Sequence, residues 1–301
     1  MTNILSIDRS VRRFGRGGIQ LAAPRGEALS YEQIAHFAPT VFANDRHSSR
    51  SERFQVIPTH ELLSGLSKEG FVPVKVQVGG SRDEEKRAFT KHLIRFRRQD
   101  DLAGAPKVGD SHPEVVLLNA HDGTSSYQLH AGLFRLVCLN GLTVSDQNFG
   151  SVKVGHSGRG VLDKVIEGTY RVLDDAVTAL EAAQELRAVE LSQDERRIFG
   201  EAALRLRFEE ESLPRDITGL QVTRPRRDAD HGNNLWLTFN KAQENLIRGG
   251  LSYRHVNQET NRTTYRDTRA VNGADGDLKL NRALWHLANE FAKLKGHSVA
   301  A

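Results

Sequence analysis

The stretch that decides the fold runs from Glu114 to Val137 and reads EVVLLNAHDGTSSYQLHAGLFRLV. Its first six residues form a short apolar run, which is typical of a buried strand. Asp122-Gly123 follows, and this dipeptide is a strong signal for a tight hairpin turn. Tyr127 through Val137 should therefore return as an antiparallel partner, and the hairpin predicts a sheet at the centre of the protein.

Further strands are expected on both sides of this hairpin. Residues 71–78 and 91–98 precede it, and both alternate between apolar side chains and polar or charged ones. After the hairpin, two shorter runs, 142–144 and 152–154, can extend the same sheet. The expected result is an antiparallel β-meander.

Helices are expected to cover this sheet and to form the C-terminal part. From Val161 the apolar residues recur every three or four positions, which predicts a long amphipathic helix across the sheet. A second helix should end near Phe208, another should surround Trp236, and a last one should stop at Gly296. We expect N-terminal caps at Ser30, Thr59, Ser192 and Asp277.

These elements predict the α+β class: an antiparallel β-meander packed against a long amphipathic helix, with additional C-terminal helices. Residues 1–26 are basic and glycine-rich, and we expect a flexible leader there. Residues 27–301 are expected to form a single α+β domain. Within it, the sheet and long helix should occupy about 71–208 and the helical C-terminal part about 233–296.

Composition limits where the protein works. The 301 residues include one cysteine, Cys138, which lies in an apolar run, so an intramolecular disulfide is impossible and a reducing compartment is favoured. The start lacks the pattern of a secretory signal, and no long uncharged segment suggests a membrane span. We therefore expect a cytoplasmic protein without a membrane partner. Its oligomeric state stays open, with a homo-oligomer as one form.

Cations cluster in two places, although the formal net charge is only +4. A strand over 91–98 would place Lys91, Arg95 and Arg97 on one face as a row matched to phosphates, with Tyr127 nearby to stack a base. A solvated outer face that protects a sheet edge is the alternative. The second cluster interleaves arginines with tyrosines: Arg224, Arg226, Arg227, Arg248, Tyr253, Arg254, Tyr265 and Arg266.

Other chemistry has weaker support. Asp228-Ala229-Asp230-His231 and His121-Asp122 are the nearest approaches to a metal site, but neither is a recognised ligand pattern, and a loop and a turn explain them. Cys138 is expected in the core, where burial raises a thiol pKa. Asn240, Gln243, Glu244 and Asn245 form a polar set on one helix; such groups can read bases or hold a partner, but we expect the amides to satisfy buried backbone groups of loops. We predict no catalytic residue, metal or cofactor, and we favour a binding protein over an enzyme.

Several strings resemble one family of phage- and plasmid-borne proteins of unknown function. They are Ser51 to Thr59, Lys91 to Arg98, Glu114 to Asn119, His121 to Tyr127, Gly132 to Arg135, Leu235 to Asn240, Gln243 to Asn245 and Leu280 to Trp285. The resemblance implies an accessory protein of a mobile genetic element and carries no established reaction, cofactor or catalytic residue. A looser, architectural similarity is to phage single-strand annealing proteins, which place a long helix over an antiparallel meander.

Together these patterns predict a nucleic-acid-binding accessory protein that binds or anneals single-stranded DNA through its basic sheet face and C-terminal arginines. The alternative is a protein-interaction factor, such as an inhibitor of a host defence enzyme, with a host or mobile-element protein as its partner. Salt dependence distinguishes the two, because phosphate contacts weaken steeply as salt rises. A metal-dependent nuclease ranks last.

Overall fold

A computed structural model describes residues 11–14, 18–24, 26–49, 58–103, 111–135, 141–144, 152–154, 161–214, 216–256, 259–271 and 273–297. The chain divides into two compact units, with the border inside the long helix at Thr178. The first unit takes in the described residues up to Phe134, the strand 152–154 and the helix as far as Val177. The second unit takes in 178–297 and the short strand 141–144.

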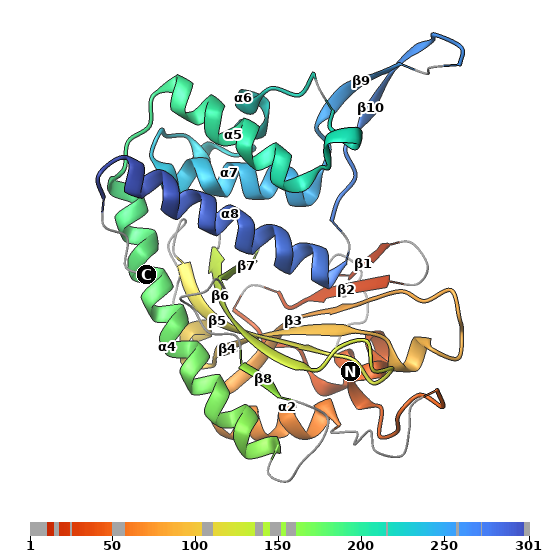
Figure 1. Ribbon diagram of the computed structural model, residues 1–301. Helices are drawn as coiled ribbons and strands as arrows, with labels where there is room; N and C mark the ends of the chain where they lie inside the picture. The colour runs from red at the N-terminus through yellow and green to blue at the C-terminus, as the bar shows by residue number, and fades with distance from the viewer. Residues whose placement is uncertain are drawn as a thin grey trace. The chain divides into compact units, whose positions relative to one another are not determined.

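The first unit is built on the antiparallel meander that the sequence predicts (Figure 1). Its strands follow one another in chain order from β1 to β6, and β8 pairs with β6. The hairpin turn lies at Gly123, whose φ of 75° is the left-handed conformation that glycine adopts most easily. The strands are β1 (Val11–Phe14), β2 (Gly18–Ala22), β3 (Phe71–Val78), β4 (His92–Arg98), β5 (Ser111–Asn119), β6 (Tyr127–Arg135) and β8 (Val152–Val154).

Helices cover one face of this sheet. Ile94 and Phe96 on β4 and Leu117 on β5 belong to the same buried cluster as Leu62 and Val172, which lie on two of the helices. The alternation along each strand sends these side chains to a single face, where the helices bury them. The helices of this unit are α1 (Tyr31–Phe37), η2 (Pro39–Phe42), α2 (Thr59–Lys68), η3 (Arg87–Phe89), α3 (Asp100–Ala103) and the first part of α4 (Val161–Ala188).

The N-terminal residues differ from the flexible leader that the sequence predicts. Val11–Phe14 and Gly18–Ala22 form β1 and β2, and β2 pairs with β3 in antiparallel register. Leu21 anchors this pairing because its side chain is buried in the core of the unit. The many glycines around these strands favoured the prediction of a flexible segment, although the strands themselves contain apolar residues such as Leu21. Residues 1–10 lie outside the described part of the chain.

The second unit is helical, apart from β7 (Gly141–Val144) and a two-stranded hairpin. Trp236 and Phe239 stack on α7, and Trp285 of α8 meets Phe239 edge-on at 6.0 Å between ring centroids, so aromatic packing joins the two helices. Its elements are the rest of α4, α5 (Gln193–Arg207), η4 (Glu210–Ser212), α6 (Gly219–Val222), η5 (Asp228–Asp230), α7 (Leu235–Arg248), β9 (Ser252–Val256), β10 (Thr263–Asp267) and α8 (Ala274–Leu294).

Two of the four predicted helix caps are confirmed and two are wrong. Ser30 and Ser192 each close a capping box at the start of α1 and α5. Pro58 occupies the cap position of α2, so Thr59 is the first helical residue. Gly273 precedes α8, and Asp277 instead accepts a hydrogen bond from Asn281 one turn later. None of the helices in the described ranges has the length and apolar character needed to cross a bilayer.

Candidate nucleic-acid interface and buried polar clusters

The arginines of β4 do not form the solvent-facing row that the sequence suggested. The side chain of Arg95 is 1% exposed, and its Nη1 lies 3.0 Å from a carboxylate oxygen of the buried Glu114. Arg97 donates from Nε to the other carboxylate oxygen of Glu114 at 2.7 Å. The register that pairs Phe96 with Val115 explains the contact, because it brings Glu114 beside Arg97 on the neighbouring strand.

Glu114 is charged in this arrangement. Burial alone would raise the pKa of its carboxyl group, but the charges of Arg97 and Arg95 and their hydrogen bonds outweigh burial and hold the pKa below its ordinary value. Two cations and one anion therefore form an ion cluster within the first unit. Lys91, which directly precedes β4, is half-buried and stays a candidate for phosphate contact.

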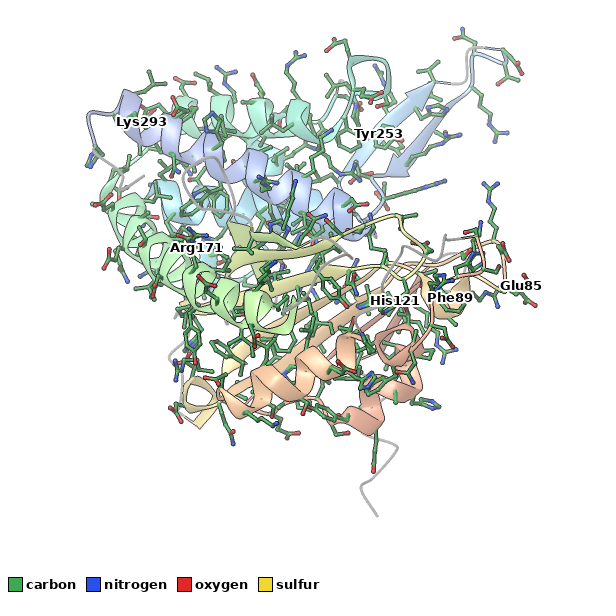
Figure 2. The ribbon with its side chains drawn as sticks, turned by 60° about the horizontal axis from the view of Figure 1, so that its bottom comes forward. Glu85, Phe89, His121, Arg171, Tyr253 and Lys293 are labelled. Atoms are coloured by element: carbon green, nitrogen blue, oxygen red, sulfur yellow. The ribbon has the colours of Figure 1, made fainter. Side chains whose placement is uncertain are left out.

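Tyr127 is not the exposed stacking platform that the sequence predicts. Its side chain is buried in the core of the first unit, and burial raises the pKa of its hydroxyl. It lies at one end of the sheet in a polar cluster, which we call the histidine cluster. Figure 2 shows His121 at this end beside Phe89, whose carbonyl accepts a hydrogen bond from the His121 backbone. The cluster comprises Thr40, Thr59, His92, Asn119, His121 and Tyr127.

Thr59 is the centre of the histidine cluster. Its Oγ1 lies 3.0 Å from Nε2 of His92 and accepts a hydrogen bond from Nδ2 of Asn119 at 3.0 Å. His92 and Asn119 are directly opposite in the pairing of β4 with β5, so their side chains share one face. The first turn of α2 places Thr59 over that pair. The hydroxyl therefore satisfies buried polar groups of the sheet.

Hydrogen bonding also fixes the tautomer of His92. The hydroxyl of Thr40 donates to the carbonyl oxygen of Thr90 at 2.8 Å, so toward His92 Nδ1, 3.3 Å away, it can only accept. Nδ1 of His92 consequently carries the proton, and Nε2 accepts from the hydroxyl of Thr59. Burial, with a further contribution from His121, lowers the pKa of His92 to about 3.

The low pKa of His92 determines what this imidazole can do. An imidazole with so low a pKa is a weak base at neutral pH. No group of three metal-binding side chains of the His, Cys, Asp or Glu type occurs in the described residues. Asp122 next to this cluster accepts hydrogen bonds from the backbone and hydroxyl of Thr124, as a turn aspartate does.

The second basic cluster separates into two groups, and the first group is structural. Glu244 on α7 is 2% exposed, and its carboxylate contacts both Arg227 and Arg248. Arg226 donates to Asn245 Oδ1 and to the carbonyl oxygen of Gly249. These three arginines hold the chain around α7 in place. Arg224 is exposed.

Amides complete this structural group, as the sequence predicts. Asn245 donates from Nδ2 to the carbonyl oxygens of Val222 and Arg224 at 2.7 and 2.9 Å. Gln243 donates to Asn281 on α8 at 2.6 Å. Within the string Asp228-Ala229-Asp230-His231, Asp230 is buried and pairs with Arg227, while Asp228 is exposed. This string thus forms part of the same scaffold.

The second group lies on an exposed hairpin, which we call the ribbon: β9 and β10 in antiparallel pairing. It extends away from the helices of its unit, and Tyr253 lies near its base (Figures 1 and 2). Arg254 is paired with Tyr265 and Tyr253 with Arg266, so each face of the ribbon carries one arginine beside one tyrosine.

Polar contacts fix the root of the ribbon. The backbone of Gly250 and Thr268 is paired, and Thr268 Oγ1 also accepts from the amide of Leu251 at 3.1 Å. Gly249 has a φ of 69°, and a Cβ there would lie 2.4 Å from the carbonyl oxygen of Thr268, so only glycine permits this approach. Arg226 binds the same Gly249 from the other cluster. Arg226 thus joins the first group of arginines to the root of the ribbon.

A family model described as a domain of unknown function, DUF932, matches residues 46–285. The chain belongs to this DUF932 family. It is 43% identical over 280 residues to the UPF0380 proteins YfjQ and YafZ of Escherichia coli strain K12, an alignment that covers 93% of this chain and 96% of each relative. No solved structure matches it significantly.

Sequence reasoning about this DUF932 chain missed the anions that hold its arginines. Neither Glu114, at the start of a predicted strand, nor Glu244, within a polar set on a predicted helix, was expected to bind arginine, yet both are buried and each contacts two arginines. A signal existed for Glu114: it precedes an unbroken apolar run, where an unpaired charge is costly. The role of Thr59 had no local signal, because its partners lie 33 and 60 residues away.

Proposed function

We propose that the protein binds nucleic acid through the ribbon, as an accessory protein of a mobile genetic element. The observation that carries the proposal is the cross-strand pairing of arginine with tyrosine on both faces of the ribbon, in which Arg254, Tyr265 and Arg266 are exposed and Tyr253 is half-buried. Arginine supplies the charge that attracts phosphates, and a tyrosine ring offers a surface on which a base can stack. The role in a mobile genetic element rests on the resemblance of several sequence strings to phage- and plasmid-borne proteins.

Charge and shape support this choice of surface. Residues 252–256 and 259–269 contain four arginines, Arg254, Arg262, Arg266 and Arg269, against two carboxylates, Glu259 and Asp267. Two-stranded ribbons are a known means of contacting nucleic acids. An isolated two-stranded hairpin is marginally stable in water. The contacts at the root stabilise the ribbon before a ligand binds, which lowers the entropy cost of binding.

The test is fluorescence anisotropy with labelled single- and double-stranded oligonucleotides across a salt series. The double variant R254Q/R266Q should bind more weakly than the wild type, and for a single strand its salt dependence should be less steep by about 0.7 per lost phosphate contact. The control R82Q/R171Q removes the same charge from exposed sites in the first unit and should bind normally.

Absence of binding by the wild type at low salt would refute the proposal and favour the alternative of a protein partner. Equal losses in R254Q/R266Q and R82Q/R171Q would show that net charge, and not the ribbon, drives association. Both variants should keep the circular dichroism spectrum of the wild type, since all four side chains are exposed.

A further inference from the structure

Tyr265 is unusual among the aromatic side chains of the described residues. Its exposure is 79%, against 41% for Tyr31 and 39% for Tyr170, the other large aromatics that are exposed. Burying such a ring against a ligand would remove much apolar surface from water. The high exposure marks Tyr265 as a contact point rather than a member of the core.

The two faces of the ribbon are not equivalent. One face carries Tyr253 and His255, which are both half-buried. The opposite face carries Arg254 and Val256 on β9 and Tyr265 and Asp267 on β10, and all four are exposed. We call this opposite face the open face of the ribbon. It is the face on which a ligand finds the most uncovered surface.

The open face combines three kinds of contact within one cross-strand neighbourhood. Tyr265 lies directly opposite Arg254, so ring and guanidinium are neighbours on the same side of the ribbon. Val256 follows two residues after Arg254 and adds apolar surface, with an exposure of 42%. A ligand that matches this set has a flat ring, and beside the ring it carries a negative charge.

We propose that the open face binds single-stranded nucleic acid, with an unpaired base stacked on Tyr265 and a backbone phosphate on Arg254. This inference rests on the proposed function and specifies its substrate class. A duplex keeps its bases stacked on each other, so it cannot offer a base face to Tyr265 without being opened. A single strand offers both a base face and a phosphate at each nucleotide.

The experiment compares an oligothymidine with an oligonucleotide of equal length that has abasic sites at most positions. Y265L should weaken binding to the oligothymidine roughly 5- to 150-fold, which corresponds to about 1–3 kcal/mol for one stacked base, and should leave the abasic strand unaffected. Y265F should bind as the wild type does. R254Q should weaken binding to both strands, because both carry phosphates.

The control variant is Y31L, which removes an exposed tyrosine of the first unit and should change neither affinity. Wild-type affinity of Y265L for the oligothymidine would overturn the stacking inference while leaving nucleic-acid binding intact. Tighter binding of a duplex than of the single strand would overturn the substrate class. If the wild type bound none of these oligonucleotides, the proposed function itself would fail, so the two failures are distinguishable.

Discussion

The histidine cluster makes the stability of the first unit dependent on pH in a predictable way. The folded protein holds His92 neutral because burial and His121 lower its pKa from 6.5 to about 3. The unfolded chain protonates the same imidazole near pH 6.5. Stability from this group is therefore complete above pH 6.5 and decreases as the pH falls toward 3, because protons bind the unfolded state preferentially.

The size of the effect follows from the two pKa values. Between pH 8 and pH 5 the difference in proton binding at His92 should reduce the free energy of unfolding by about 2 kcal/mol. At pH 4 the loss should grow to about 3 kcal/mol. Replacing His92 with glutamine removes the titrating group, so the H92Q variant should lack this part of the pH dependence, although its stability at pH 8 should be lower.

Hydrogen exchange is the suitable assay, because both tryptophans, Trp236 and Trp285, lie in the second unit and their fluorescence does not report on the first. Exchange rates of the β4 and β5 amides, corrected for intrinsic rates, should rise about 30-fold more in the wild type than in H92Q between pH 8 and pH 5, the equivalent of about 2 kcal/mol.

The control is H36Q, which changes an exposed histidine on α1 and should keep the wild-type pH dependence. The informative quantity is the difference between the wild type and H92Q. If the two proteins lost stability in parallel from pH 8 to pH 5, His92 would not be held neutral in the fold, and the reasoning from burial would be refuted.

Three further stability predictions follow from buried contacts. Glu114→Gln should destabilise the protein by about 3–5 kcal/mol, measured by thermal denaturation, because Arg95 would stay buried with its counter-charge removed. Thr59→Val should cost about 2–4 kcal/mol in denaturant unfolding, since two buried polar side chains would lose a partner. Gly219→Ala should lower the melting temperature, because its Cβ would lie 1.8 Å from a backbone oxygen of α5, whereas Gly273→Ala, with open space around it, should have little effect.

Local patterns predicted most of the fold. The meander followed from alternation and from Asp122-Gly123, and the long helix followed from the change of period at Val161. Caps were harder to predict. Ser192 was recognised because its partner Glu195 is three residues away, whereas Thr59 was misread because a threonine before an apolar run fits a cap equally well. A helix cap depends on residues close in sequence, whereas the buried partners of the Thr59 hydroxyl lie on strands that are distant in sequence.

The candidate interface could be predicted only in part. The ribbon residues Tyr253, Arg254, Tyr265 and Arg266 were singled out from composition, and the structure brings them into two cross-strand pairs. Composition could not supply the register, and register determines which arginine lies beside which tyrosine. A shift of one residue would place both arginines on one face of the ribbon and both tyrosines on the other.

Arginine content by itself was a poor guide to a nucleic-acid surface, and the reason is physical. A guanidinium satisfies a buried carboxylate as readily as a phosphate, because both present oxygens in the same forked geometry. What separates the two uses is whether the fold supplies an anion. Glu114 does so for Arg95, and Glu244 does so for Arg227 and Arg248. On the ribbon, Arg254 lies opposite a tyrosine, and Asp216 accepts a hydrogen bond from the backbone amide of Arg254. A variant that places glutamate opposite the guanidinium, Tyr265→Glu, should create an internal ion pair and weaken oligonucleotide binding more than Tyr265→Leu does.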